Sequence, residues 1–389
     1  MLSKETRNNS FLFVCTLVGV IFGLAVMSSY ENKTDFGDAA LGKGTVSYFH
    51  KDKSGNSIHF LPKNSYNDFL NGLSIYSSYP KILFLGNSQS HSINQKELND
   101  NTLTGYLYES FISDSILFFA SSIPNANLQE HYLLSQFFFD SISNIETLLL
   151  PVFFDDFRED GIRESYFGDF SKSLYQIAEN NSLAKRINSK LEIWQQKIKS
   201  NSNDTTASIE NNDFTALNKT TQDVVERKLN DVLYRKFNFW QNRQQIRGEF
   251  FTTLYLSRNT AFGISAQTTR KKITSRYLKN KETLSLIINS CKKRDINLIL
   301  IIPPLRTDIK YPYDESEYSQ FKEYVNSFTL NGIHVLDLED IVEPEYWGYS
   351  SPTQLFQTKD YDFMHFQVEG HKVFADTILD VSQNLNNDI

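Results

Sequence analysis

Cysteine is nearly absent from this chain of 389 residues, which contains only Cys15 and Cys291. Cys15 lies in an apolar run and Cys291 in a predicted soluble helix, so a disulfide between them is not expected. The seven histidines are scattered, and no Cys/His group has the spacing of metal ligands. The sequence therefore predicts no structural zinc site, and we expect no cofactor.

An excess of basic residues is also missing, because the formal net charge is −7. No basic face with interleaved aromatic residues is present, which argues against nucleic-acid binding. Phenylalanine, in contrast, is abundant at 31 residues, and hydrophobic residues make up 40% of the chain. These values are typical of a globular protein with a well-filled core, and the length fits one large α/β domain with an insertion or two modest domains.

One long apolar run without charge occupies residues 11–27, and Lys4 and Arg7 precede it. A run of roughly 20 apolar residues can cross a bilayer as a helix. Basic residues before it favour a cytoplasmic N-terminus. We expect residues 1–30 to form a cytoplasmic tip and a single-pass anchor in the cell membrane, with the rest extracytoplasmic, either periplasmic or extracellular. A cleaved signal peptide and a buried core helix stay open as alternatives.

Five short apolar runs follow at residues 81–85, 116–120, 147–154, 297–302 and 333–336. Each is continuous and rich in Ile, Leu, Val or Phe, as in strands buried on both faces of a parallel sheet. Helical stripes of apolar residues lie between them. This alternation predicts an α/β fold, a three-layer α/β/α sandwich around a mainly parallel five-stranded sheet.

The remaining segments suggest how the chain is divided. Residues 31–78 are polar and have no clear period, which suggests a juxtamembrane stalk, and residues 79–389 would form the domain. Within the domain, residues 161–280 form a predicted insertion, helical at both ends and with a polar loop at 200–222. It could be a lid, a partner-docking surface, a substrate platform or a cap without chemistry.

Two motifs carry groups suited to nucleophilic catalysis. Gly86, Asn87 and Ser88 follow the first predicted strand, so Ser88 would lie at the carboxyl edge of the sheet, where ligands bind in open α/β folds. Near the C-terminus, Asp362 precedes His365 by three residues, and such an acid can orient an imidazole toward a serine. Taken separately, the first motif is also a common polar turn, and the second could merely cap the helix that follows.

Together the two motifs resemble those of the SGNH/GDSL hydrolase superfamily, whose first block is a Gly-Asp-Ser-like turn and whose last is Asp-x-x-His. The resemblance covers residues 79–385 apart from the insertion. It implies that Ser88 is the nucleophile, His365 the base and Asp362 the orienting acid. An α/β-hydrolase elbow is disfavoured, because position 90 is serine rather than glycine and the acid lies beside the histidine.

The two middle blocks of the family match less well. The resemblance places Ser122 and Asn125 at two glycine positions, where the amide of Ser122 could still bind an oxyanion. Asp155 stands where the family has an asparagine donor, and a carboxylate cannot donate unless it is protonated. Either another group supplies this donor, or Asp155 points elsewhere, for example to Arg158 or Arg163.

This departure favours a divergent, membrane-anchored branch that resembles proteins of D-alanyl transfer to teichoic acids and of polysaccharide O-acetylation. The resemblance implies a serine acyltransferase that forms an acyl-enzyme and modifies an envelope or exported glycan. Its expected partners are the membrane, the glycan acceptor and a multispanning membrane acyltransferase. An SGNH-type O-acyl esterase and a non-catalytic subunit of an envelope glycan complex are the alternatives.

Overall fold

The computed structural model describes residues 44–61, 66–163, 170, 175–202 and 243–387. The predicted membrane anchor at residues 11–27 lies outside these ranges. Within them, no helix combines the length and the apolar character needed to cross a membrane.

A five-stranded sheet with the order β4-β2-β5-β6-β7 forms the centre, and each neighbouring pair is parallel. Its strands are β2 (Lys81–Gly86), β4 (Leu117–Ser122), β5 (Ile145–Pro151), β6 (Asn297–Ile302) and β7 (His334–Asp337). All five predicted strands are therefore in this sheet.

The strand predicted at residues 147–154 extends beyond the end of the observed strand β5. β5 ends at Pro151, because the Asp156 carboxylate accepts the N–H of Phe153 at 2.8 Å and the chain turns into the short helix η4 (Asp155–Phe157).

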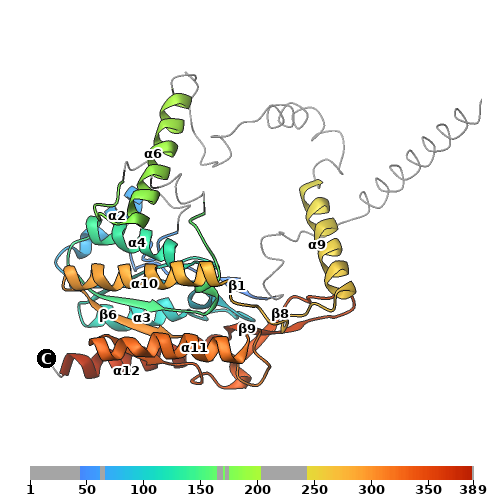
Figure 1. The fold of residues 1–389 in the computed structure, drawn as a ribbon. Coiled ribbons are helices and arrows are strands. Elements are labelled where there is room, and N and C mark those ends of the chain that lie inside the picture. The colour runs from blue at the N-terminus through green and yellow to red at the C-terminus, as the bar shows by residue number, and fades with distance from the viewer. Residues whose placement is uncertain (1–43, 62–65, 164–169, 171–174, 203–242, 388–389) are drawn as a thin grey trace, which may run out of the picture. The chain divides into compact units, whose positions relative to one another are not determined.

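Helices cover both faces of the sheet. Helix α4 (Leu128–Ser141) packs on α10 (Thr274–Lys293), and α3 (Leu103–Ser113) packs on α12 (Val368–Asn387). Figure 1 shows these two pairs on opposite sides of the strands. Right-handed crossovers require this, because the chain moves from β2 to β4 in one direction and from β4 to β5 in the other. The predicted three-layer arrangement is confirmed.

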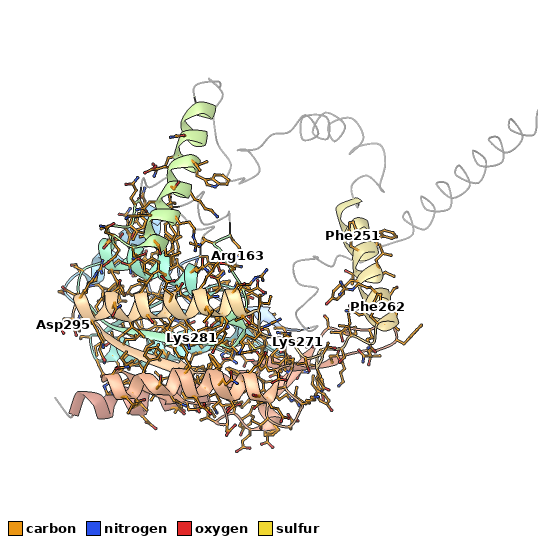
Figure 2. The ribbon with its side chains drawn as sticks, in the orientation of Figure 1. Arg163, Phe251, Phe262, Lys271, Lys281 and Asp295 are labelled. Carbon is orange, nitrogen blue, oxygen red and sulfur yellow. The ribbon has the colours of Figure 1, made fainter. Side chains whose placement is uncertain are left out.

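Helix α11 (Glu315–Asn326) lies beside α10, whose Lys281 is labelled in Figure 2. The Lys281 ammonium lies 3.8 Å from the centre of the Tyr324 ring, and the backbone carbonyl of Lys281 accepts the Tyr324 hydroxyl at 3.3 Å. A short helix, η6 (Ser327–Asn331), follows α11. The chain then forms β7, the helix η7 (Pro344–Tyr346) and an antiparallel hairpin of β8 (Trp347–Ser350) and β9 (Asp360–Phe366).

The described residues before position 79 are part of the domain, so the predicted stalk at 31–78 is wrong for them. Strand β1 (Val46–Ser47) pairs with β3 (Ser92–Ile93), and His59 forms a parallel bridge with Ala120 of β4. Helix α2 (Tyr66–Leu73) buries Phe69 and Leu73, and η2 (Ser74–Tyr76) follows it. In α2 the apolar residues have the i, i+3, i+4, i+7 spacing of an amphipathic helix, a signal that the interpretation of this segment as a stalk passed over.

The predicted insertion is helical at both ends, in α6 (Ser182–Ser202) and α9 (Arg243–Ala261), whereas residues 203–242 lie outside the described ranges. Clustering of contacts divides the chain into two units. Of the described residues, the first contains 243–264 and 351–358, and the second contains the others, including the sheet and α6. The predicted insertion at 161–280 is therefore not one body, and its last residues belong to the sheet-covering α10.

Candidate active site

The turn after β2 positions Ser88 at the carboxyl edge of the sheet, in a short helix, η3 (Ser88–Ser90). The side-chain oxygen of Asn87 caps this helix by accepting the Gln89 amide at 3.0 Å. The Gln89 side chain in turn donates to the carbonyl of Pro304 at 2.7 Å, which ties the turn to the loop after β6. These contacts fix the backbone on both sides of the Ser88 hydroxyl.

Gly86 ends β2, and only glycine fits there. A Cβ at this position would lie 2.5 Å from the Phe84 ring and 3.1 Å from the Ser90 hydroxyl. Any side chain would therefore displace the buried Phe84 ring or the turn that carries Ser88.

His365 on β9 lies where the sequence predicted a base. Its Nε2 lies 2.9 Å from the Ser88 Oγ, although 277 positions separate the two residues. This distance is within the hydrogen-bond range expected for a general base and its proton donor. The His365 side chain is 12% exposed and Ser88 is 8% exposed, so both are shielded without being sealed off.

Asp362 lies on the other side of the imidazole. Its Oδ2 is 3.0 Å from the His365 Nδ1, and its Oδ1 accepts the amides of Met364 and His365 at 2.9 and 3.0 Å. Burial alone would raise the pKa of Asp362, but the adjacent His365 and these hydrogen bonds outweigh it and hold the pKa below its usual value.

An ionised carboxylate can only accept hydrogen bonds. The neutral imidazole of His365 must therefore carry its proton on Nδ1, facing Asp362, and present the lone pair of Nε2 to the Ser88 hydroxyl. The structure thus brings Ser88, His365 and Asp362 into one hydrogen-bonded chain in the order of a serine triad.

His91, the other histidine near Ser88 in sequence, does not compete for this role. Its Nδ1 lies 2.6 Å from the Ser122 hydroxyl, and the side chain is fully buried. Burial, reinforced by the nearby His59, His365 and His371, holds the pKa of His91 well below its usual value. His91 is therefore a neutral core residue bonded to Ser122.

The contacts of the Ser122 amide differ from those expected of an oxyanion-binding group. Its amide donates to the Nε2 of His59 at 3.1 Å, and its hydroxyl lies 2.7 Å from the same nitrogen. The amide expected to bind an oxyanion already has an acceptor, so this geometry does not support that role. The physical reason is that His59 packs along β4, and the sequence had placed His59 in the stalk.

Asn125 lies in the exposed loop after β4. The loop is held beside the Ser88 turn, because the Ile123 amide donates to the Gly86 carbonyl at 3.1 Å. Asn125 has a φ of +52°, a left-handed conformation that glycine and asparagine adopt most readily. This backbone explains how asparagine can stand at a family glycine position.

Asp155 follows β5 and is fully engaged, as the sequence suggested. It pairs with Arg158 and with Arg270, both at 2.6 Å, and accepts the hydroxyl of buried Tyr313 at 3.0 Å. The other predicted partner, Arg163, instead pairs with buried Glu130 at 2.6 Å. Asp155 therefore serves a local ion-pair network.

The sequence missed two residues of this region, His59 and Asn94. The Asn94 side chain reaches the Asp362 carboxylate at 3.3 Å, and both asparagine and histidine are too common to stand out without a motif. No group of three or more His, Cys, Asp or Glu in the described ranges could hold a metal ion, and Cys291 is buried and free.

A cavity of about 850 Å³ lies elsewhere, beside α11, η6 and Glu339. Tyr311, Tyr318 and Lys322 are among the residues that line it, but none of the three triad residues does. We therefore locate the candidate site by its hydrogen-bond geometry and not by the size of a cavity.

No family model and no curated protein matches the sequence. A search of solved structures finds similarity to a candidate acylhydrolase of Bacteroides fragilis, at 10% sequence identity and a TM-score of 0.32. The match covers 80% of this chain and 96% of that chain. Similarity at this level says nothing about activity, so any assignment of function depends on the side-chain geometry.

Proposed function

We propose that this protein transfers acyl groups through Ser88, as a divergent SGNH-like enzyme. The observation that supports the proposal most directly is the chain from the Ser88 Oγ to the His365 Nε2 at 2.9 Å and from the His365 Nδ1 to Asp362 at 3.0 Å. A serine, a neutral imidazole and an ionised acid in this order are the parts that nucleophilic acyl transfer needs.

In the first half-reaction the Ser88 Oγ attacks the acyl carbonyl while the His365 Nε2 takes the hydroxyl proton. Asp362 stabilises the imidazolium that forms. The imidazolium then protonates the leaving oxygen, the bond to the leaving group breaks, and an ester with Ser88 remains. In the second half-reaction His365 takes the proton of an incoming hydroxyl, whose oxygen attacks the ester carbonyl. The bond between the acyl carbon and the Ser88 Oγ then breaks, and the imidazolium returns the proton to Ser88.

The oxyanion that forms in each half-reaction must be stabilised by hydrogen-bond donors. The amide of Ser88 is one candidate, because the first amides of a helix have no acceptor within it and Ser88 begins η3. The backbone around Asn125 is a second candidate, since that loop is bonded to Gly86. Asp155 is tied to two arginines and adds no donor.

The acceptor in this proposal is a hydroxyl of an envelope or exported glycan, and the chain is anchored in the membrane by residues 11–27 with its domain outside the cytoplasm. The apolar run and the basic residues before it support this topology. Protease added to intact spheroplasts should digest the domain. Digestion only after lysis would contradict the proposed location.

A non-catalytic role is the second candidate, because the Ser122 amide is occupied by His59 and Asp155 replaces the expected donor. Labelling with a fluorophosphonate, which reacts with activated serines, separates the two. Wild type should be labelled, Ser88→Ala should not, and the matched control Ser290→Ala, which alters a buried serine on α10, should behave like wild type. Absence of labelling in folded wild type would favour the non-catalytic role.

The identity of the base is tested with the same probe. His365→Gln should lose labelling, whereas His91→Gln should keep most of it, because His91 contacts the Ser122 hydroxyl. The reverse pattern would contradict the assignment of His365.

A separate experiment distinguishes transfer from hydrolysis. A soluble oligosaccharide is added while the enzyme turns over an acetyl ester, and the fraction of acetyl groups that reaches the sugar is measured.

A further inference from the structure

The β8–β9 hairpin loses its regular pairing where the triad residues lie. Trp347 pairs with Phe366 and Tyr349 pairs with Tyr361, so the single residue Gly348 faces the four residues 362–365. Such a bulge leaves backbone groups without cross-strand partners, and it needs another group to fix its shape. We call residues 362–365 the triad bulge.

The side chain of Asn94 occupies this gap. Its Nδ2 lies 3.1 Å from the Tyr349 carbonyl, 3.4 Å from the His365 carbonyl and 3.3 Å from the Asp362 Oδ2. Its Oδ1 accepts the Tyr349 amide at 3.3 Å. Asn94 is fully buried, and its own amide donates to the carbonyl of Phe366 at 3.0 Å. One carboxamide therefore contacts both strands and the acid.

Gly348 makes room for this arrangement. A Cβ on Gly348 would lie 2.1 Å from the Asn94 Cγ, so no side chain is compatible with the present position of Asn94. On the other side, the buried Arg306 donates to the Gly348 carbonyl at 2.9 Å. The backbone opposite the triad bulge is thus held from two directions.

We propose that Asn94 is a positioning residue, which sets the orientation of Asp362 and His365 by holding the triad bulge. This inference rests on the proposed function of Ser88, and it adds a residue that does not itself touch the reacting atoms. Asp362 accepts from both the His365 Nδ1 and the Asn94 Nδ2 through one oxygen, Oδ2. Losing Asn94 would free that oxygen and the two carbonyls to move.

Other ionisable groups lie near the triad bulge, and Arg270, which stacks over the Phe363 ring, is paired with Asp155. Burial lowers the pKa of His371 to about 3 and that of His91 well below its usual value, so neither gains a proton in the working range. Arg306, on the far side of Gly348, is paired with Asp308. A difference in the pH profile of labelling between wild type and an Asn94 variant therefore reports a change at the triad bulge.

The test measures the rate of fluorophosphonate labelling against pH in the full chain. Asn94→Leu should slow labelling at the optimum on the order of tenfold to a hundredfold, because misplacement of a catalytic group by about 1 Å can cost that much. Asn94→Asp should also slow labelling and change its pH profile, because a carboxyl would replace the donor to the Asp362 Oδ2 and two carbonyls, and two carboxyls that close cannot both ionise. Gly348→Ala should resemble Asn94→Leu.

Asn280→Leu is the matched control, because Asn280 is also fully buried and also donates to two backbone carbonyls, those of Phe157 and Glu159. It should lose stability but keep the pH profile of wild type. If the folded Asn94 variants also keep that profile and rate, the positioning role is contradicted.

A second readout is independent of activity. The low-field proton resonance of the His365 Nδ1–H, observed in a Ser88→Ala background, should shift or broaden in Asn94→Ser and stay in place in Asn280→Leu. An unchanged resonance in Asn94→Ser would overturn the inference even if larger substitutions fail to fold. If the His365 resonance responds to Asn94 but wild type is not labelled, the positioning role of Asn94 stands and only the proposed function is contradicted.

Discussion

Two turns at the same edge of the sheet are built alike and carry different chemistry. The turns after the neighbouring strands β2 and β5 both lead into a three-residue helix, η3 or η4. The first presents Ser88 to an imidazole at 2.9 Å. The second presents Asp155 to two guanidinium groups at 2.6 Å.

The difference lies in what reaches each turn from distant parts of the chain. At Ser88 the partner is a base that can take a proton, whereas at Asp155 the partners are permanent cations that compensate a charge. The sheet thus supplies equivalent positions, and the partners decide whether a position is reactive or stabilising. Substitutions at Ser88 and its partners should change the reaction, and substitutions at Asp155 should change stability.

The largest expected effect is that of Ser88→Ala. Acyl transfer should fall to background, a loss of about 10⁶-fold if the residue acts as triad nucleophiles do. The melting temperature should change little, because only one hydroxyl is removed. Turnover of an acetyl ester and thermal unfolding of the same preparation measure both. A variant that retains more than a few per cent of activity would place the nucleophile elsewhere.

Asp362→Asn should have the next largest effect. An amide cannot accept from the His365 Nδ1–H through its nitrogen, and loss of the orienting acid lowers kcat by about 10⁴-fold in serine triads. Steady-state kcat and KM are measured together. We expect the loss in kcat, so a variant affected only in KM would show that Asp362 binds substrate instead.

Asp155→Ala should reduce stability more than activity, the reverse of the effects of Ser88→Ala and Asp362→Asn. It leaves two arginines and the buried Tyr313 hydroxyl without their acceptor, and hydrogen bonds to charged groups contribute about 1.5–3 kcal/mol each. We expect a loss of free energy of unfolding in that range, measured by urea denaturation, with kcat reduced by less than about tenfold. Glu159→Gln, which removes an exposed pair with Arg276, is the control and should cost less than about 1 kcal/mol. A loss of kcat as large as that of Asp362→Asn would remove the distinction between the turns.

The smallest expected effect concerns acid stability. The folded-state pKa of Asp362 is below its usual value, so this group stabilises the fold above the unfolded pKa of about 3.9 and loses that contribution as the pH falls through the folded value. The difference in melting temperature between wild type and Asp362→Asn should therefore be constant near neutral pH and shrink below about pH 4. A difference that grows on acidification would mean that the pKa of Asp362 is raised.

The sheet and the triad could be predicted because each has a local signature. Residues 298–302 form an uninterrupted apolar run within β6, and Asp362 and His365 are three positions apart. The parallel sheet places Ser88 at its carboxyl edge, and the separate β8–β9 hairpin carries the acid and the base to it.

The contacts that surround Ser122 and Asp155 could not be predicted, because they join residues far apart without a pattern. His59 meets Ser122 across 63 positions, and Arg270 meets Asp155 across 115. His59 lies in a mostly polar segment that the sequence suggested was a stalk, although Ile58 and Phe60 beside it are buried. Packing of that segment along β4 decides which amides are free.

The most direct test of the central claim is to trap the acyl-enzyme. The full chain is mixed with an activated acetyl ester, quenched in acid and digested, and the peptide that contains Ser88 is examined by mass spectrometry. The account predicts one acetyl group on Ser88 in wild type and none in His365→Gln. An acetyl group on another residue, or equal acetylation of Ser88 in His365→Gln, would contradict the claim that Ser88, His365 and Asp362 act as a triad.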